Sequence, residues 1–109
     1  MKETKLGKIY SVEFGSVKDY PFLMGLQMTF KLEDGFFIGN GVHGTVNISS
    51  SCNWGEKNRS DEITKIIETL HKILDDAKVN YVSELLGKPV EVTIDNGVFV
   101  GFRILTEVI

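Results

Sequence analysis

Cysteine, histidine and proline are scarce in this chain of 109 residues, which contains one cysteine, two histidines and two prolines. Cys52 alone cannot form an internal disulfide bond. Together with His43 and His71 it supplies too few ligands for a structural zinc site, which takes about four. The sequence therefore predicts a chain without a disulfide bond, a metal or a cofactor.

Long apolar runs are also missing, because no segment approaches the roughly 18 apolar residues of a membrane span. The first five residues are mostly polar or charged, and no apolar signal segment follows them, which favours a cytoplasmic location without a membrane. A basic excess is absent too, since 12 Lys and Arg face 15 Asp and Glu. The net charge of −3 does not favour nucleic acid as a partner, although it leaves room for a local basic patch.

The remaining composition is that of an ordinary globular protein, with 42% hydrophobic and 25% charged residues. A chain of this length buries roughly 65% of its unfolded surface when it folds as one unit. We therefore expect residues 1–109 to form a single domain.

Alternating apolar residues predict two strands before the middle of the chain. The first covers residues 10–14, with Tyr10, Val12 and Phe14 on its buried face, and residues 15–21 are expected to break it. The second covers residues 22–32 and is the most regular strand pattern in the chain. Its predicted buried face consists of Phe22, Met24, Leu26, Met28, Phe30 and Leu32.

A third strand is expected to return from the turn at Asp34-Gly35, beginning with residues 36–38. Glycines at positions 39, 41 and 44 make this strand irregular and predict a bulge or a close approach of two backbones.

One long amphipathic helix is expected over residues 60–78. Ser60 is a plausible N-cap, and Asp61 and Glu62 suit the positive end of the helix dipole. Apolar residues at spacings of three and four predict that one face of the helix covers the sheet, while the opposite face is solvated. The apolar stripe consists of Ile63, Ile66, Ile67, Leu70, Ile73, Leu74 and Ala77.

Residues 80–86 predict a further helical turn that Gly87 ends. A hairpin follows, in which residues 90–94 and 98–104 alternate on either side of Asn96-Gly97, a type I′ turn signal. The fold class is therefore α+β: an antiparallel sheet of about five strands, in the order βββ-α-ββ, with the helix packed on one face. A small barrel of the oligonucleotide-binding type is the alternative.

Two patterns suggest chemistry, but neither predicts an enzyme. The glycines of residues 39–44 match a dinucleotide-binding fingerprint, yet no helix follows them, so a strand bulge is favoured; an anion cradle of backbone amides stays open. Cys52 and His43 could act as nucleophile and base, but nothing in the sequence brings them together. We therefore predict no catalytic residues.

The polar segment 47–59 is the longest predicted loop, and its one large apolar side chain, Trp54, lies near two cations. An aromatic ring beside cations suits the recognition of a protein surface, a base or a phosphate. The alternative is that Trp54 folds back onto the edge of the core. The candidate binding residues are Asn40, His43, Asn53, Trp54, Lys57 and Arg59.

Four segments, residues 9–15, 25–30, 85–93 and 102–109, carry a resemblance to a known family. The third reads Leu-Leu-Gly-Lys-Pro-Val-Glu-Val-Thr, and the last runs from Phe-Arg-Ile-Leu to the end of the chain. Over nearly its full length the chain resembles a family of small, mostly uncharacterised proteins of bacteriophages and prophages. The shared motifs look structural and bring no catalytic residues, and the chain departs most from the family in residues 35–54.

The resemblance implies a non-enzymatic phage accessory protein in the cytoplasm of a host cell. Such proteins inhibit bacterial immunity, as anti-CRISPR proteins do, by binding a nuclease complex or by sequestering a nucleotide signal. A single-stranded nucleic-acid binding module of a phage is the alternative. A homodimer is also expected. Apolar strand edges, including a terminal strand that ends in Val108-Ile109, have unpaired backbone groups that another chain can pair with.

Overall fold

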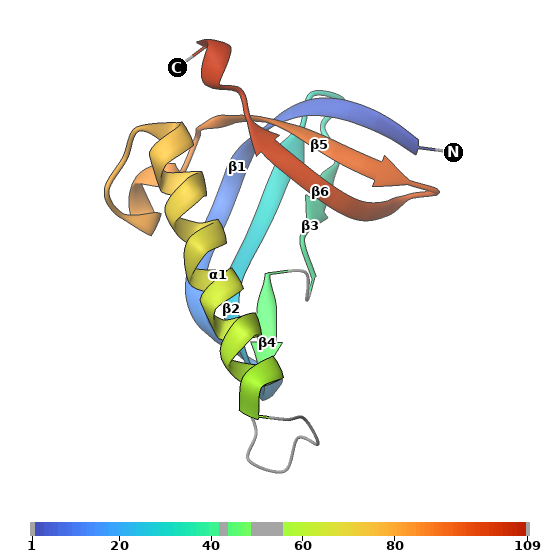
Figure 1. The fold of residues 1–109 in the computed structure, drawn as a ribbon. Coiled ribbons are helices and arrows are strands. Elements are labelled where there is room, and N and C mark those ends of the chain that lie inside the picture. Colours follow the sequence, from blue (N-terminus) through green and yellow to red (C-terminus); the bar gives the residue numbers. More distant parts are fainter. Residues whose placement is uncertain (1, 42–43, 49–55, 109) are drawn as a thin grey trace.

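The computed structural model describes residues 2–41, 44–48 and 56–108, without the side chains of residues 56–59. These residues form an α+β protein that consists mostly of antiparallel sheet, as the sequence predicts (Figure 1). The strands are β1 (Lys2–Val17), β2 (Tyr20–Leu32), β3 (Phe37–Gly39), β4 (Thr45–Asn47), β5 (Pro89–Asp95) and β6 (Val98–Ile104). The helices are α1 (Glu56–Ala77) and the short 3₁₀ helices η1 (Val82–Leu85) and η2 (Thr106–Val108).

The strands lie in the order β3-β2-β1-β5-β6, and β4 also pairs with β2. The long strand β1 is shared, because residues 2–8 pair with β5 and residues 7–17 pair with β2. Across the described residues β3 and β6 do not pair, so the sheet stays open and the barrel alternative is not realised. The predicted order is also wrong, since four strands precede the helix. Strand β4 has only three residues, too few to show an alternating pattern.

The β1–β2 hairpin is longer than predicted, because β1 continues to Val17 and the turn occupies Lys18 and Asp19. The sequence predicts a break at Gly15, but Gly15 pairs with Gly25 of β2 inside the ladder. Phe14 and Ser16 on either side of it are also paired with β2, so the strand continues through Gly15.

Tyr10 is the extra residue of a β-bulge in β1. Ile9 pairs with Phe30 and Ser11 pairs with Thr29, so Tyr10 has no partner in the ladder. The bulge shifts the alternation by one residue. Ile9 and Val12 consequently face the core, while Tyr10 is 60% exposed, and the predicted inward position of Tyr10 is wrong.

A second irregularity has the same effect in β6. Thr93 pairs with Gly101 and Ile94 pairs with Phe99, which leaves Val100 unpaired. Phe99 is therefore buried, whereas Val98 and Val100, which the predicted alternation groups with the buried Ile104, are exposed.

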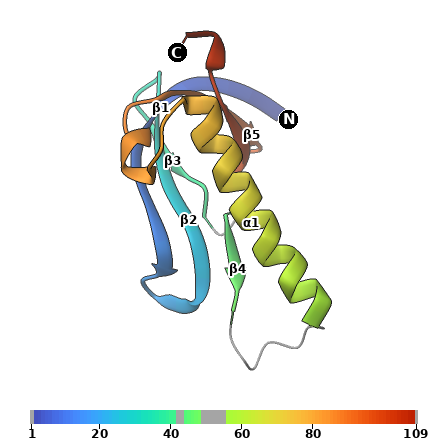
Figure 2. The same cartoon turned by 60° about the vertical axis from the view of Figure 1, so that its left-hand side comes forward.

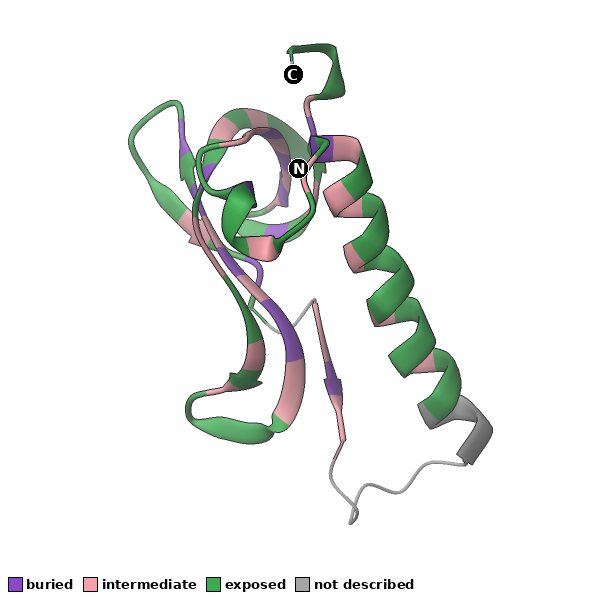
Figure 3. Ribbon diagram, turned by 90° about the vertical axis from the view of Figure 1, so that its left-hand side faces the viewer, coloured by how far each residue is buried: buried purple, intermediate pink, exposed green. Residues whose placement is uncertain are grey.

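The core lies between the inner face of the sheet and the carboxyl-terminal half of α1 (Figure 3). Phe30 is fully buried at its centre, where its ring stacks on that of Phe99 and is tilted against that of Phe102. The other buried apolar residues of this cluster are Ile9, Leu26, Met28, Leu32, Ala77, Leu85, Val90, Val92, Ile94 and Ile104.

Helix α1 begins at Glu56, so Ser60 lies inside the helix and is not its N-cap. The helix packs against β4, β6 and η1 rather than along the whole face of β2 (Figure 2). Its last residue, Ala77, is fully buried, but Ile63 and Ile67 in the first half are 40% and 53% exposed. The expectation that the entire stripe is covered by the sheet is therefore wrong.

The predicted turns are confirmed. Asn96 and Gly97 both have positive φ angles, as a type I′ turn requires, and Gly87 ends the short helix η1 with a positive φ. At the turn between β2 and β3, Lys5 donates a 2.7 Å hydrogen bond to the Asp34 carboxylate, and the backbone N–H of Phe36 donates another hydrogen bond to it. These two bonds lower the pKa of Asp34 below its ordinary value, because they favour the charged form.

The terminal strand expected to end at residues 108–109 does not form in the described part of the chain. Strand β6 ends at Ile104, and the 3₁₀ helix η2 follows.

Candidate binding groove

A groove of about 330 Å³ runs between α1 and the sheet. Its polar edge includes Thr45 of β4, Glu62, Lys65 and Thr69 of α1, and Asn40 after β3. Its walls are mainly apolar and come from three elements: Leu26 of β2, Ile66, Leu70 and Ile73 of α1, and Phe99 and Phe102 of β6.

Local structure explains why these side chains converge. Ile66, Leu70 and Ile73 repeat at spacings of four and three, which places them on one face of α1. Phe99 and Phe102 are three residues apart and would face opposite sides of a regular strand. The bulge at Val100 turns both of them toward Phe30. The groove thus depends on an irregularity that the alternating pattern does not reveal.

The apolar surface continues from the groove along the exposed part of α1. We call Ile63, Ile66, Ile67 and Leu70 the α1 strip. Ile66 and Leu70 line the groove, while Ile63 and Ile67 lie one turn apart and are 40% and 53% exposed. The apolar periodicity of α1 predicts that all four residues are covered by the sheet, but periodicity shows only which residues share a face and not whether another element covers it.

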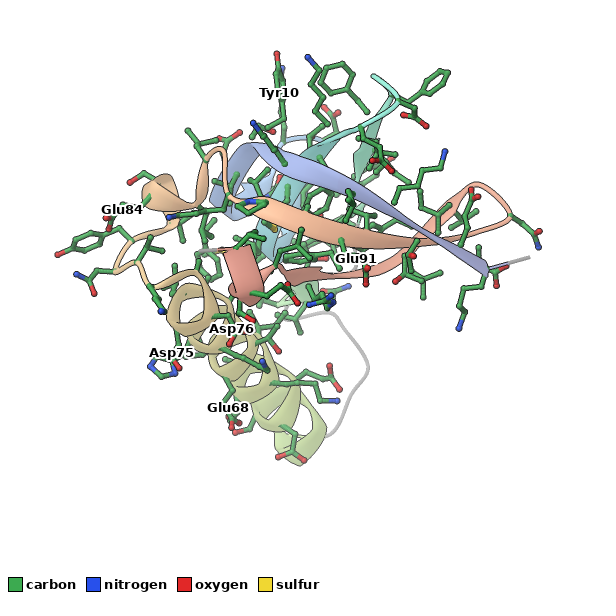
Figure 4. All side chains as sticks on the ribbon, turned by 90° about the horizontal axis from the view of Figure 1, so that it is seen from above. Tyr10, Glu68, Asp75, Asp76, Glu84 and Glu91 are labelled. Carbon is green, nitrogen blue, oxygen red and sulfur yellow. The ribbon has the colours of Figure 1, made fainter. Side chains whose placement is uncertain are left out.

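Charged groups near the groove are few and exposed. Glu62 and Lys65 form a 3.7 Å ion pair at its rim, and such pairs contribute little to stability. Glu68 and Asp75 are exposed, as predicted for the solvated face of α1. Figure 4 shows these carboxylates on α1, with Tyr10 on the opposite side of the sheet.

Asn40 is the only predicted site residue whose side chain the structure describes, and it is 5% exposed. Its Nδ2 donates a 2.9 Å hydrogen bond to the Leu26 carbonyl, and its Oδ1 accepts a 3.1 Å bond from the Met28 N–H. Strand β3 ends at Gly39, so the Asn40 carboxamide continues the pairing of β2 where the third strand stops. A binding role for Asn40 stays a prediction, and its contacts give it a structural role.

Replacing Asn40 by alanine is expected to lower the free energy of unfolding by about 1–3 kcal/mol, because the change removes two buried hydrogen bonds to the backbone of β2. Urea denaturation followed by circular dichroism measures the effect. Asn80→Ala is the matched control, since Asn80 is exposed, and a change within about 0.5 kcal/mol is expected there. Equal losses in both variants would contradict the structural role.

The other candidate binding residues remain untested. His43, Asn53 and Trp54 lie outside the described residues, as does Cys52. Lys57 and Arg59 lie in the first turn of α1, but their side chains are not described.

Among the described residues no group of three or more His, Cys, Asp or Glu side chains could hold a metal ion. No helix in this part of the chain is long and apolar enough to cross a membrane.

The fold and the groove define a small α+β protein, in which helix α1 packs against an open antiparallel sheet. Comparisons of the chain with protein-family models, with curated proteins and with solved structures find no match.

Proposed function

We propose that this protein is a non-enzymatic accessory protein of the bacteriophage type, which binds a host defence protein in the host cytoplasm and inhibits it. The α1 strip and the adjoining groove are the proposed binding surface. The resemblance of the chain to phage proteins supports the biological setting. The exposure of Ile63 and Ile67 beside an apolar groove supports the mode of action.

The α1 strip is costly to leave in water. Burying an isoleucine side chain fully is worth about 1.5–3 kcal/mol, and Ile63 and Ile67 leave about half of that unrealised. A helical face with exposed isoleucines that leads into an apolar hollow is typical of a surface that another protein covers.

The chemistry of the groove favours a protein over a nucleotide signal as its occupant. Lys65 is the only cation among its described lining residues, and it already pairs with Glu62. A nucleotide needs several donors for its phosphates, whereas apolar side chains of a partner need walls such as Leu26, Ile73 and Phe99. Of the two modes of counter-defence, binding a nuclease complex thus suits this groove better.

Ile67→Asp is expected to abolish capture of the partner, because it places a charge in the middle of the proposed interface. Wild-type protein is expected to capture a defence protein from infected bacteria and to restore plaquing on hosts that carry that defence system. The variant should do neither. Because Ile67 is 53% exposed, the thermal unfolding midpoint of the Ile67→Asp variant should stay close to that of the wild-type protein.

Thr64→Asp is the matched control, because it introduces the same side chain at an exposed position of the same helix outside the strip. It should capture the partner and restore plaquing as the wild type does. If the wild-type protein captures no defence protein and restores no plaquing on any defence-bearing host, the proposal is wrong.

A second copy of this chain is the competing occupant of the α1 strip. The predicted homodimer remains a proposal, and native mass spectrometry distinguishes it. A wild-type dimer that Ile67→Asp converts to a monomer would show that the strip is a self-association surface, and the defence-protein interface would then have to lie elsewhere.

A further inference from the structure

The outer face of the sheet, which points away from α1, carries an exposed group of aromatic and basic side chains. The rings of Tyr10 and Phe37 meet edge to face, with centroids 4.8 Å apart and an angle of 71° between their planes. The Lys31 ammonium lies 5.9 Å from the centroid of the Phe37 ring. Tyr10 is 60% and Phe37 52% exposed. With Lys8 we call this group the outer platform, and Figure 4 shows Tyr10 projecting from that side.

The sheet register places two lysines side by side on the outer platform. Lys8 of β1 is directly opposite Lys31 of β2, which in turn is opposite Phe37 of β3. Neighbouring strands are about 4.8 Å apart, and like charges in directly opposite positions repel each other. The whole chain has more acidic than basic residues, yet this face carries two adjacent positive charges.

Neither lysine forms an ion pair with a described carboxylate, whereas four other described cations do. Lys5, Lys72 and Arg103 bind Asp34, Asp76 and glutamates respectively. Across the part of the chain that the structure describes, Lys8 and Lys31 have no carboxylate within 4 Å. No described carboxylate therefore competes at this distance with an anion from solution.

Tyr10 supplies the aromatic part of the outer platform from the bulge in β1. It follows the core-facing Ile9, so it points outward, where its ring meets that of Phe37, and the bulge lets Val12 face the core again. Bulges are over-represented next to functional sites. Two exposed rings that contact each other, instead of the core, offer flat apolar surfaces beside two cations.

We propose that the outer platform binds single-stranded nucleic acid, with bases stacked on Tyr10 and Phe37 and phosphates at Lys8 and Lys31. Aromatic rings bind any unpaired base through its π face, and lysines follow the backbone by charge. Bases paired in a duplex are stacked on each other and not available to these rings. The acidic balance of the whole chain does not oppose this, because the charges that act on the strand are the two on this face.

A hollow of about 400 Å³ adjoins the lysines and gives the strand room to continue. It is lined by Lys8 and Lys31 together with Leu6, Gly7, Leu32 and Glu33. Glu33 is the single carboxylate among these lining residues, and its negative charge would repel a phosphate in the hollow. Glu33→Gln is therefore expected to tighten binding.

Fluorescence anisotropy with a labelled 12-mer of thymidine tests the outer platform at low salt and along a salt titration. The affinity should fall as salt rises, and Lys8→Gln and Lys31→Gln should each reduce the slope of log K against log salt by about 0.7. Tyr10→Ala and Phe37→Ala should each weaken binding about tenfold. Tyr10→Phe keeps the ring and should bind as the wild type does, which separates stacking from a loss of folding.

Two controls match these changes elsewhere on the surface. Lys18→Gln removes the same charge at the exposed β1–β2 turn, and Tyr20→Ala removes a ring from the Tyr20–Phe22 pair, which also meets edge to face. Both should bind the 12-mer as the wild type does. No saturable binding at low salt, or equal losses in the control and platform variants, would overturn the proposal.

Competition by adenosine monophosphate separates a strand from a free nucleotide. A single-strand site should be displaced far less by the mononucleotide than by an equal concentration of unlabelled 12-mer. Equal displacement would overturn the assignment to single strands. Ile67→Asp, on the other side of the sheet, should leave 12-mer binding unchanged, so this proposal and the proposed function succeed or fail separately.

Discussion

Phe30→Ala is expected to lower the free energy of unfolding by about 3–5 kcal/mol. Phe30 has no exposed surface. Its ring is stacked on that of Phe99, with the two centroids 5.7 Å apart, and the centroid of the Phe102 ring lies 4.9 Å away. Alanine removes these contacts and leaves a cavity between β2 and β6, which neighbouring rings fill only in part. Because small domains are stable by only about 5–15 kcal/mol, much of the variant should be unfolded at moderate urea concentrations.

Urea denaturation followed by far-ultraviolet circular dichroism measures this loss. Phe36→Ala is the control: Phe36 is 71% exposed, so a change within about 0.5 kcal/mol is expected. If Phe30→Ala cost no more than Phe36→Ala, the core would not be centred on the stack of Phe30 and Phe99.

Gly25→Ala is expected to destabilise the protein by about 3 kcal/mol, because it forces β2 and β4 apart. A Cβ atom at position 25 would overlap the Gly44 carbonyl oxygen and lie 2.7 Å from the Cα atom of Thr45. Both neighbours are backbone atoms, so no side-chain rotation relieves the overlap. The same contact includes a 2.9 Å hydrogen bond from the Leu26 N–H to the Gly44 carbonyl.

Hydrogen exchange shows where the strain acts. In Gly25→Ala the amide of Leu26 should exchange faster, since its acceptor on Gly44 moves away, and the midpoint of urea denaturation should fall. Gly15→Ala is the matched control, because Gly15 pairs with Gly25 across β1 and β2, yet a Cβ atom there meets nothing within 4 Å. An equal loss in both variants would show that β-strand glycine itself, and not the approach of β4, causes the effect.

The groove should respond to Gly25→Ala as well. Thr45 of β4 and Leu26 of β2 line it from neighbouring strands, so a shift of β4 changes its shape. A Cβ atom at Gly44 would lie 2.6 Å from the Leu26 carbonyl oxygen, which confirms the close backbone approach predicted for the glycine-rich segment.

Features encoded by neighbouring residues were predictable. Strand β2 follows from a simple alternation, although Phe22, predicted to be buried, is 44% exposed. The turn at Asn96-Gly97 follows from two residues that tolerate positive φ. The helical stripe follows from spacings of three and four. Each of these signals lies within one element, where side-chain period and backbone conformation are directly linked.

The candidate surfaces depend on contacts between distant residues. The six predicted binding residues lie between positions 40 and 59, and the one described side chain among them, Asn40, bonds to the backbone of β2. The outer platform instead joins β1, β2 and β3, and within it Tyr10 is the residue that the alternating pattern places on the wrong face.

The sequence by itself determined the α+β class, the most regular strand, the helix and the tight turns, because these follow from local periodicity and turn chemistry. Tertiary structure alone decided the bulges at Tyr10 and Val100, the short strand β4 and the exposure of Ile63 and Ile67. A bulge depends on the register between two strands, and the exposure of a helical face depends on how far the sheet extends beneath it. Neither is a property of any single segment, and both proposed binding surfaces arise from them.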